Sequence, residues 1–148
     1  MKSLQTVIVP QYFDVPLFDR KVQKSAEETT EETKKVWQHH IQAWDAVDLD
    51  AIMADYSEDS ILILNNTVKK GIEPVRNVFA NLFDLFSKGQ NIIDPEVIEE
   101  EVIYITWHFT PEAEGGTCYF GTDSFVVQNS IIKYQTIGSS LYEKYIVT

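Results

Sequence analysis

One stripe of a predicted helix combines broad aromatic rings with a titratable imidazole. In the segment WQHHIQAW, the 3.6-residue period of a helix places Trp37, His40, Ile41 and Trp44 on one face, whereas His39 points elsewhere. An imidazole gains or loses a proton near neutral pH, so His40 could act as a general acid or base. The stripe therefore indicates either a packed core with a hydrogen-bonded histidine or the wall of a pocket.

Other reactive patterns are weak in this chain. Its three histidines show no HxxxH or HxxE spacing, and the carboxylates of residues 99–101 alternate between the two faces of a predicted strand. The six glycines form no GxGxxG phosphate-binding loop. The single cysteine, Cys118, excludes an intrachain disulfide and a cysteine-based zinc site. We expect no metal ion and no cofactor.

The charge balance excludes some classes of partner. The 148 residues include 12 Lys and Arg against 23 Asp and Glu, and this net charge of -11 disfavours contact with a phosphate backbone or an anionic membrane surface. With 44% hydrophobic residues, the composition is that of a globular domain. No apolar run approaches the roughly 18 residues of a membrane span, and no signal peptide is indicated. We therefore expect a cytoplasmic protein without a nucleic-acid or membrane partner.

Three predicted helices come first in the chain and would position the stripe. Ser25 and Glu28 form a capping box at the start of a helix that continues to about residue 47. Asp48 caps a second, short helix. The third helix, IEPVRNVFANLFDLFSKG, is expected to end with Gly89 as its C-cap.

Extended segments dominate the second half of the chain. Helices followed by an antiparallel sheet indicate the α+β class and a single domain of residues 1–148. Within it, residues 1–24 form an apolar extended arm, which could act as a lid, and residues 25–148 form the core. The expected strands and extended stretches are residues 60–64, 67–70, 97–110, 117–127, 130–138 and 141–148.

This order of elements resembles the nuclear transport factor 2-like (NTF2-like) superfamily, in its SnoaL-like branch of polyketide cyclases. The segments that carry the resemblance are AWDAVDLDAIMADYSEDSILI, GIEPVRNVFANLF and GTDSFVVQNSIIKYQTI. The resemblance implies a cone in which three N-terminal helices pack in a strongly curved, mixed but mostly antiparallel sheet. It also implies an apolar cavity lined by the aromatic stripe, and a homodimer formed through the outer face of the sheet.

Ketosteroid isomerases of this superfamily suggest which residues could move a proton. They place a tyrosine on the first helix, a protonated aspartic acid on a late strand and an aspartate base after the second helix. The matching positions in this chain are His40, Asp123 and Leu64. Because leucine cannot accept a proton, the resemblance disfavours steroid isomerisation by that route. It implies instead that His40 and Asp123 are the catalytic pair and meet within hydrogen-bonding distance in the cavity.

Aromatic residues complete the expected ligand site. Strand alternation places Trp107 on the inner face and His108 on the outer face of the long strand, and Tyr119 shares the face of Asp123. Tyr134 is expected on the inner face of the next strand. The predicted ligand-binding residues are Trp37, Trp44, Tyr56, Phe79, Trp107, Tyr119 and Tyr134.

Two functions remain open at this stage. The first is a cofactor-independent cyclase, dehydratase or isomerase that acts on a small hydrophobic carbonyl compound by acid–base chemistry. The second is a non-catalytic module that binds a hydrophobic ligand or presents its sheet to a partner protein. The His40 and Asp123 pair favours the first, and Leu64 at the position of the base favours the second.

Overall fold

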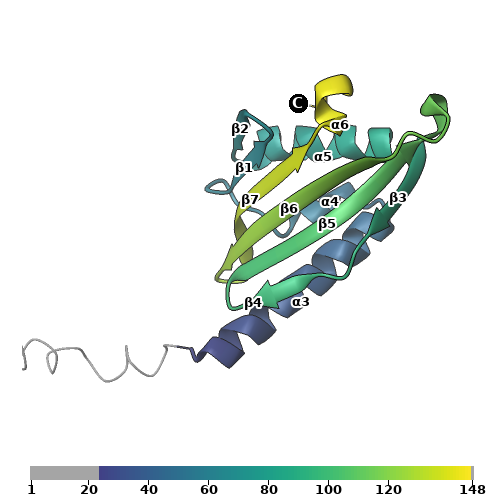
Figure 1. Cartoon of the computed structure of the whole chain (residues 1–148). Coiled ribbons are helices and arrows are strands. Elements are labelled where there is room, and N and C mark those ends of the chain that lie inside the picture. Colours follow the sequence, from purple (N-terminus) through teal and green to yellow (C-terminus); the bar gives the residue numbers. More distant parts are fainter. Residues whose placement is uncertain (1–23, 148) are drawn as a thin grey trace, which may run out of the picture.

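The computed structural model describes residues 24–147, in which helices lie against one face of a curved, seven-stranded sheet (Figure 1). This arrangement confirms the predicted α+β class. The predicted arm of residues 1–24, with its suggested role as a lid, lies outside the described residues except for Lys24. Within residues 24–147, no helix combines the length and the apolar composition required to cross a membrane.

Local sequence signals set the starts of the first two helices. The Ser25 hydroxyl accepts the backbone N–H of Glu28 at 3.1 Å, and the Glu28 carboxylate accepts the backbone N–H of Ser25 at 2.9 Å, which confirms the capping box. Asp48 accepts the backbone N–H of Ala51 at 3.0 Å and caps the second helix. The helices are α3 (Ala26–Asp45), α4 (Leu49–Met53), α5 (Ile72–Phe86) and α6 (Leu141–Lys144).

The strands of the sheet are β1 (Ile61–Leu64), β2 (Thr67–Lys70), β3 (Gly89–Ile93), β4 (Val97–Glu99), β5 (Val102–Pro111), β6 (Tyr119–Gln128) and β7 (Ile131–Ser139). Their order is β2-β1-β7-β6-β5-β3, and β4 pairs with β5 off this path. The pairing of β1 with β7 is parallel and the others are antiparallel, as predicted for a mixed, mostly antiparallel sheet.

Three predicted element assignments are wrong. The expected strand of residues 97–110 is divided, because the chain turns back at Glu100, whose φ of 51° is left-handed. Gly89 does not cap α5 but begins strand β3, which was not predicted. A Cβ atom at Gly89 would lie 2.6 Å from Cζ of Phe109, so the close approach of β5 requires glycine there. The stretch of residues 141–148, expected to be extended, contains helix α6.

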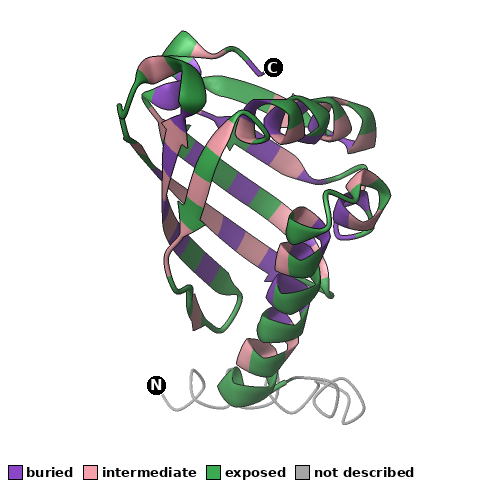
Figure 2. Ribbon diagram, turned by 90° about the vertical axis from the view of Figure 1, so that its right-hand side faces the viewer, coloured by how far each residue is buried: buried purple, intermediate pink, exposed green. Residues whose placement is uncertain are grey.

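The core lies between the helices and the inner face of the sheet. Along β5, Ile103, Ile105, Trp107 and Phe109 are buried, which confirms the predicted alternation. Figure 2 shows the same alternation of buried and more exposed segments along the strands. His108 lies on the outer face, where its side chain is 42% exposed.

A bulge in β7 changes which residues of that strand face inward. The partners of Val126 and Val127 on β7 are not consecutive, and Lys133 is the extra residue between them. Beyond the bulge, Gln135 is buried whereas Tyr134 is 42% exposed. The predicted inner position of Tyr134 is therefore wrong, because a one-residue bulge inverts the alternation that follows it.

Candidate active site

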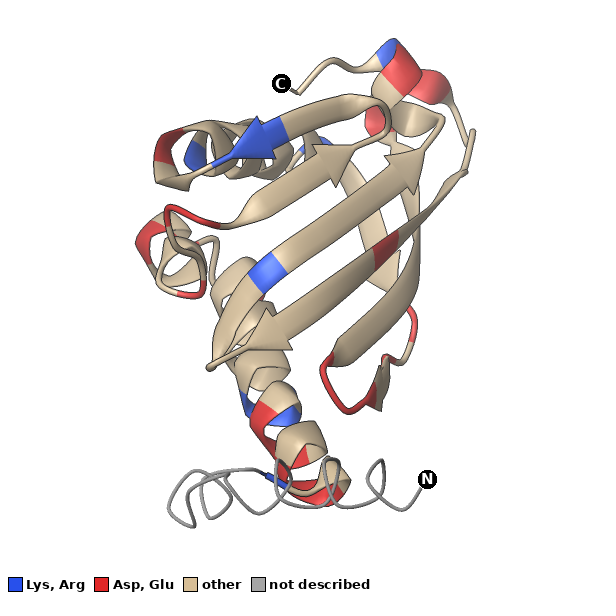
Figure 3. Cartoon of the chain, turned by 90° about the vertical axis from the view of Figure 1, so that its left-hand side faces the viewer, with Lys and Arg blue, Asp and Glu red and all other residues tan. Residues whose placement is uncertain are grey.

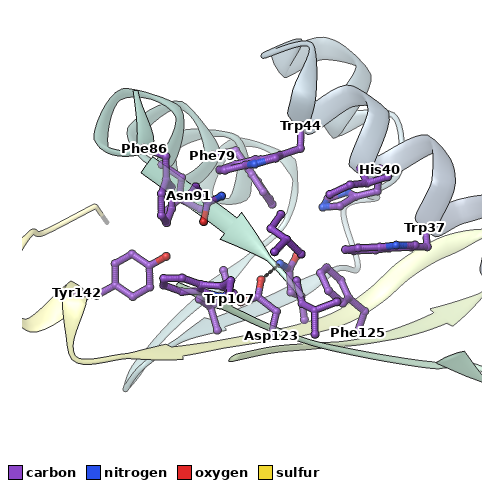
Figure 4. A pocket seen from close by; sticks show the side chains of 16 residues that line it. Trp37, His40, Trp44, Phe79, Phe86, Asn91, Trp107, Asp123, Phe125 and Tyr142 are labelled. Atoms are coloured by element: carbon purple, nitrogen blue, oxygen red, sulfur yellow. Dashed lines mark hydrogen bonds between the residues drawn. The ribbon is translucent and has the colours of Figure 1, made fainter. Parts of the chain in front are cut away.

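An aromatic-walled cavity lies between helices α3 and α5 and the inner face of the sheet (Figure 4). The four residues of the predicted stripe, Trp37, His40, Ile41 and Trp44, all line it. Its volume is about 50 Å³, which admits a few water molecules. The other walls contribute the aromatic rings of Phe79, Phe86, Trp107, Phe125 and Tyr142.

A wider groove adjoins this cavity. The groove has a volume of about 770 Å³. It shares with the cavity the lining residues Trp37, Ile41, Trp44, Phe86, Asn91 and Ile93. Small-molecule sites in proteins have volumes of about 300–1,000 Å³. The groove can therefore hold the body of a ligand, while the cavity admits only a small group at its end.

Asp123 lies on β6 and contributes its carboxylate to the cavity (Figure 4). Its Oδ1 atom accepts the indole N–H of Trp107 at 2.9 Å, and its Oδ2 atom accepts a side-chain amide N–H of Gln135 at 3.2 Å. Burial raises the pKa of Asp123 to about 6, although these two hydrogen bonds stabilise the charged form and oppose the rise. Near neutral pH the carboxyl group is therefore mostly ionised and can accept a proton.

A buried tyrosine behind the cavity orients the amide of Gln135. The Tyr56 hydroxyl donates a hydrogen bond to Oε1 of Gln135, so that Nε2 of Gln135 faces Asp123. Burial raises the pKa of Tyr56 well above its ordinary value, and the hydroxyl keeps its proton. Tyr56 thus supports a residue of the cavity and is not among the described residues that line it.

His40 lies between the cavity and the side chain of Asp55. Its Nδ1 atom lies 3.6 Å from Oδ2 of Asp55 and has no hydrogen-bond partner within residues 24–147. The neighbouring His39, half exposed, places its own Nδ1 atom 2.8 Å from Oδ1 of Asp55. In the described part of the chain, the expected hydrogen bond between His40 and Asp123 is absent, although both residues line the cavity.

Helix α6 brings a hydroxyl group to the cavity. The Tyr142 hydroxyl points into it in Figure 4, and the ring centroid of Tyr142 lies 6.0 Å from that of Trp107. Burial, and then the negative charge of Asp123, raise the pKa of Tyr142 well above its ordinary value. The hydroxyl therefore remains a hydrogen-bond donor at neutral pH.

Besides Tyr56, two more of the predicted ligand-binding residues do not line the cavity. The Tyr119 hydroxyl donates a hydrogen bond of 2.8 Å to Glu114 in the loop between β5 and β6. Tyr134 lies on the outer face of the sheet. Trp37, Trp44, Phe79 and Trp107 line the cavity at the places expected for them. Within residues 24–147, no three His, Cys, Asp or Glu side chains gather as metal ligands.

Four polar residues of the site were not identified from the sequence. Gln135 is turned inward by the bulge at Lys133, and Tyr142 belongs to a helix that was expected to be extended. Asn91 lies on the unpredicted strand β3. For Asp55, the available signal was an acidic residue just after a short helix that must pack near the two histidines of α3.

Comparison with solved structures places the architecture among known folds. A candidate SnoaL-like polyketide cyclase from Jannaschia sp. CCS1 matches with a TM-score of 0.67 at 13% identity, over 84% of this chain and 96% of that chain. An NTF2-like protein of unknown function from Mesorhizobium loti matches with a TM-score of 0.66 at 11% identity, over 74% of this chain and 92% of that chain. The chain has the NTF2-like fold.

A third similar structure carries a different proposed activity on the same NTF2-like fold. It is a candidate ketosteroid isomerase from Kribbella flavida, with a TM-score of 0.59 at 13% identity, over 73% of this chain and 77% of that chain. No protein-family model and no curated protein matches the sequence. Because one fold hosts many activities, the function of this NTF2-like chain must be argued from its site.

Proposed function

We propose that this protein is a SnoaL-like, cofactor-independent enzyme that moves a proton on a small hydrophobic carbonyl compound, as a cyclase, dehydratase or isomerase. The observation that carries the proposal is the Asp123 carboxylate, which faces an aromatic cavity and whose pKa is raised by burial to about 6. A base whose pKa lies near the working pH is efficient in proton transfer. The candidate polyketide cyclase and the candidate ketosteroid isomerase of the same fold support this reaction class by analogy.

The proposed first step is removal of a proton from the carbon next to the ligand carbonyl. Asp123 accepts this proton, while Trp107 and Gln135 hold its carboxylate in one orientation. The Tyr142 hydroxyl donates a hydrogen bond to the carbonyl oxygen, where negative charge develops as the enolate forms. Return of the same proton to a different ligand atom completes an isomerisation.

His40 supplies a second acid–base group on the opposite wall. Asp55 places a carboxylate oxygen 3.6 Å from the Nδ1 atom of His40, which favours a proton on that nitrogen, and the ring lines the cavity (Figure 4). In a dehydration, His40 protonates the oxygen that leaves. In an aldol cyclisation, it protonates the carbonyl oxygen that is attacked.

A non-catalytic ligand-binding module is the second candidate function. It is favoured by the small volume of the cavity, about 50 Å³, and by Leu64, which is 3% exposed at the position where ketosteroid isomerases carry their base. In that case the groove alone binds the ligand, and His40 and Asp123 stabilise the packing of α3 against the sheet.

We also propose that two copies of the chain associate through the outer face of the sheet. On this face Tyr104, Phe120 and Tyr134 are 44%, 53% and 42% exposed. Figure 3 shows that few segments of the strands on this side carry charge. Burial of such rings in a homodimer would remove apolar surface from water.

A cytoplasmic location is supported by the single, exposed cysteine, Cys118.

Exchange of α-protons tests the enzymatic proposal without knowledge of the natural substrate. Acetophenone, indanone and tetralone are incubated in D₂O with the full-length chain, and loss of their α-proton signals is followed by NMR. We expect exchange above the buffer rate, and a decrease of at least about 100-fold in Asp123→Asn. The exposed Asp50 is the matched control, and Asp50→Asn should exchange at the wild-type rate. Ketones that bind without exchanging would support the non-catalytic module instead.

A further inference from the structure

The polar side chains around the groove are dominated by anions. Asp45 at the end of α3, and Asp94 and Glu96 after β3, line it, whereas no lysine or arginine of residues 24–147 lines the groove or the cavity. Asp45 and Glu96 form no ion pair with another described residue. Asp94 accepts the Thr106 hydroxyl at 2.6 Å through Oδ2, and the same oxygen lies 3.8 Å from Nδ1 of His108. Within the described part of the chain, the groove therefore carries unpaired negative charge at Asp45 and Glu96.

The side-chain oxygen of Asn91, where the groove meets the cavity, is a hydrogen-bond acceptor without a donor among the described residues. The Asn91 side-chain oxygen is fully buried and has no hydrogen-bond partner within residues 24–147, and Asn91 lines both the groove and the cavity. A buried acceptor without a partner is costly, so a donor is expected from whatever occupies this place. The hydroxyl of Ser87, which also lines the groove, already donates to the backbone carbonyl of Asp84.

Aromatic rings form the apolar part of the same groove. The ring centroid of Trp44 lies 5.0 Å from that of Phe83 and 5.5 Å from that of Phe86. Trp37 extends this aromatic wall toward the cavity. The faces of tryptophan and phenylalanine rings attract cations, most strongly where water is partly excluded. Acidic side chains and aromatic faces thus favour the same kind of ligand.

We propose that the groove binds a ligand whose apolar body carries a protonated amine, and disfavours ligands that carry a carboxylate or a phosphate. The apolar body contacts Trp37, Trp44 and Phe86, and the cation lies near Asp45, Asp94 and Glu96. A rotation of the Asn91 side chain, whose oxygen is buried without ligand, lets that oxygen accept an N–H of the protonated amine. This names the ligand class of the site proposed above, and it rests on the proposed function only for the claim that the ligand is turned over.

Three probes of similar size and different charge test this ligand class. Phenylpropylamine, phenylpropanol and phenylpropanoate are titrated into the full-length chain near neutral pH and at low ionic strength. Binding is followed through the indole N–H signals of Trp37 and Trp44 in NMR spectra. We expect the amine to bind about tenfold more tightly than the alcohol and the carboxylate to bind most weakly. Added salt should reduce the difference in affinity between the amine and the alcohol, because it screens the charge on the amine.

Variants at the rim of the groove show how much of the affinity comes from charge, because they remove a carboxylate and keep the shape of the side chain. Asp45→Asn and Glu96→Gln, which lie outside the proposed acid–base machinery, should each weaken amine binding about threefold and leave alcohol binding unchanged. Glu73 is exposed at the opposite end of α5, and Glu73→Gln is the matched control that should leave all three affinities unchanged.

Three results of the titrations would overturn the proposal. They are equal affinity for amine and alcohol, tighter binding of the carboxylate, and no binding of any probe. A further test is the deletion of residues 1–23. If the deletion shifts the Trp37 and Trp44 signals without ligand, the occupant of the groove is the N-terminal segment of the chain, and the proposal is overturned as well. Failure of α-proton exchange leaves the binding result intact, because affinity is measured without turnover.

Discussion

The six-membered part of the Trp107 indole lies directly over Gly121, its partner on the neighbouring strand β6. A Cβ atom at Gly121 would lie 2.1 Å from Cζ2 of Trp107, so no side chain fits there. From this position the indole N–H reaches Asp123, two residues along β6, at 2.9 Å. Gly121, which has no side chain, thus leaves room for the Trp107 indole, whose N–H holds the carboxylate of the proposed base, Asp123.

Replacing this glycine should disturb both stability and the site. In Gly121→Ala the indole must move, and we expect the free energy of unfolding to fall by about 2 kcal/mol, the usual range for overpacking. Urea denaturation measures this change. Gly138→Ala is the matched control, because a Cβ atom there would meet only Oγ1 of Thr122 at 3.8 Å. Equal effects of the two substitutions would contradict the proposed contact.

The raised pKa of Asp123 predicts how stability depends on pH. The pKa is about 6 in the folded protein, against an ordinary value of 3.8, so the folded state binds this proton more tightly than the unfolded state does. The resulting stabilisation is complete below about pH 4 and is lost as the pH rises through about 6. Relative to Asp123→Asn, the wild-type free energy of unfolding should fall by about 3 kcal/mol in total between about pH 3 and about pH 7. Denaturant titrations of both proteins across this range measure it, and a constant difference would count against a shielded Asp123.

Asp55 should act on the reaction through His40. Asp55→Asn keeps the shape of the side chain and removes the charge beside Nδ1 of His40, so we expect α-proton exchange to slow by about tenfold or more. Nitrogen-15 chemical shifts should show a changed distribution of the His40 tautomers, which a purely structural role would not produce. His39→Gln is the control, because His39 contacts Asp55 from the half-exposed side and does not line the cavity. If His39→Gln and Asp55→Asn slowed exchange equally, the assigned role of Asp55 would be wrong.

The outer face of the sheet should govern the oligomeric state. Phe120 and Tyr104 lie on adjacent strands of this face, and Phe120→Lys would place a charge at the proposed dimer contact. Sedimentation velocity should then show monomers where the wild type forms dimers. Val68 is 63% exposed on the short strand β2, and Val68→Lys should leave the dimer intact. A wild-type protein that sediments as a monomer at all concentrations would refute the proposed dimer.

The sequence predicted those features that depend on local chemistry. The capping box at Ser25, the cap at Asp48 and the shared face of Trp37 and Trp44 follow from helix geometry, and the structure reproduces them. The inward position of Trp107 follows from strand alternation. The expectation that Asp123 lines the cavity required the family resemblance, because nothing local distinguishes it from a surface carboxylate.

The sequence failed where a single residue or a distant contact decides the structure. The bulge at Lys133 exchanges Tyr134 for Gln135 on the inner face, and no apolar pattern marks it. The place of Gly89 in β3 depends on the approach of Phe109 from another strand. The hydrogen-bond partners of Asp123 come from two strands, β5 and β7, on either side of β6, so they could not be assigned without the register of the sheet.

The titration of Asp123 tests the central claim most directly. Its side-chain carboxyl carbon, observed by carbon-13 NMR in the full-length chain and assigned with Asp123→Asn, should change shift with a midpoint near pH 6. A hydrophobic ketone bound beside the carboxylate should move that midpoint further upward, because it removes water from the charged form. A midpoint near 3.8 that no ligand displaces would show a solvent-exposed carboxylate and contradict the proposed site.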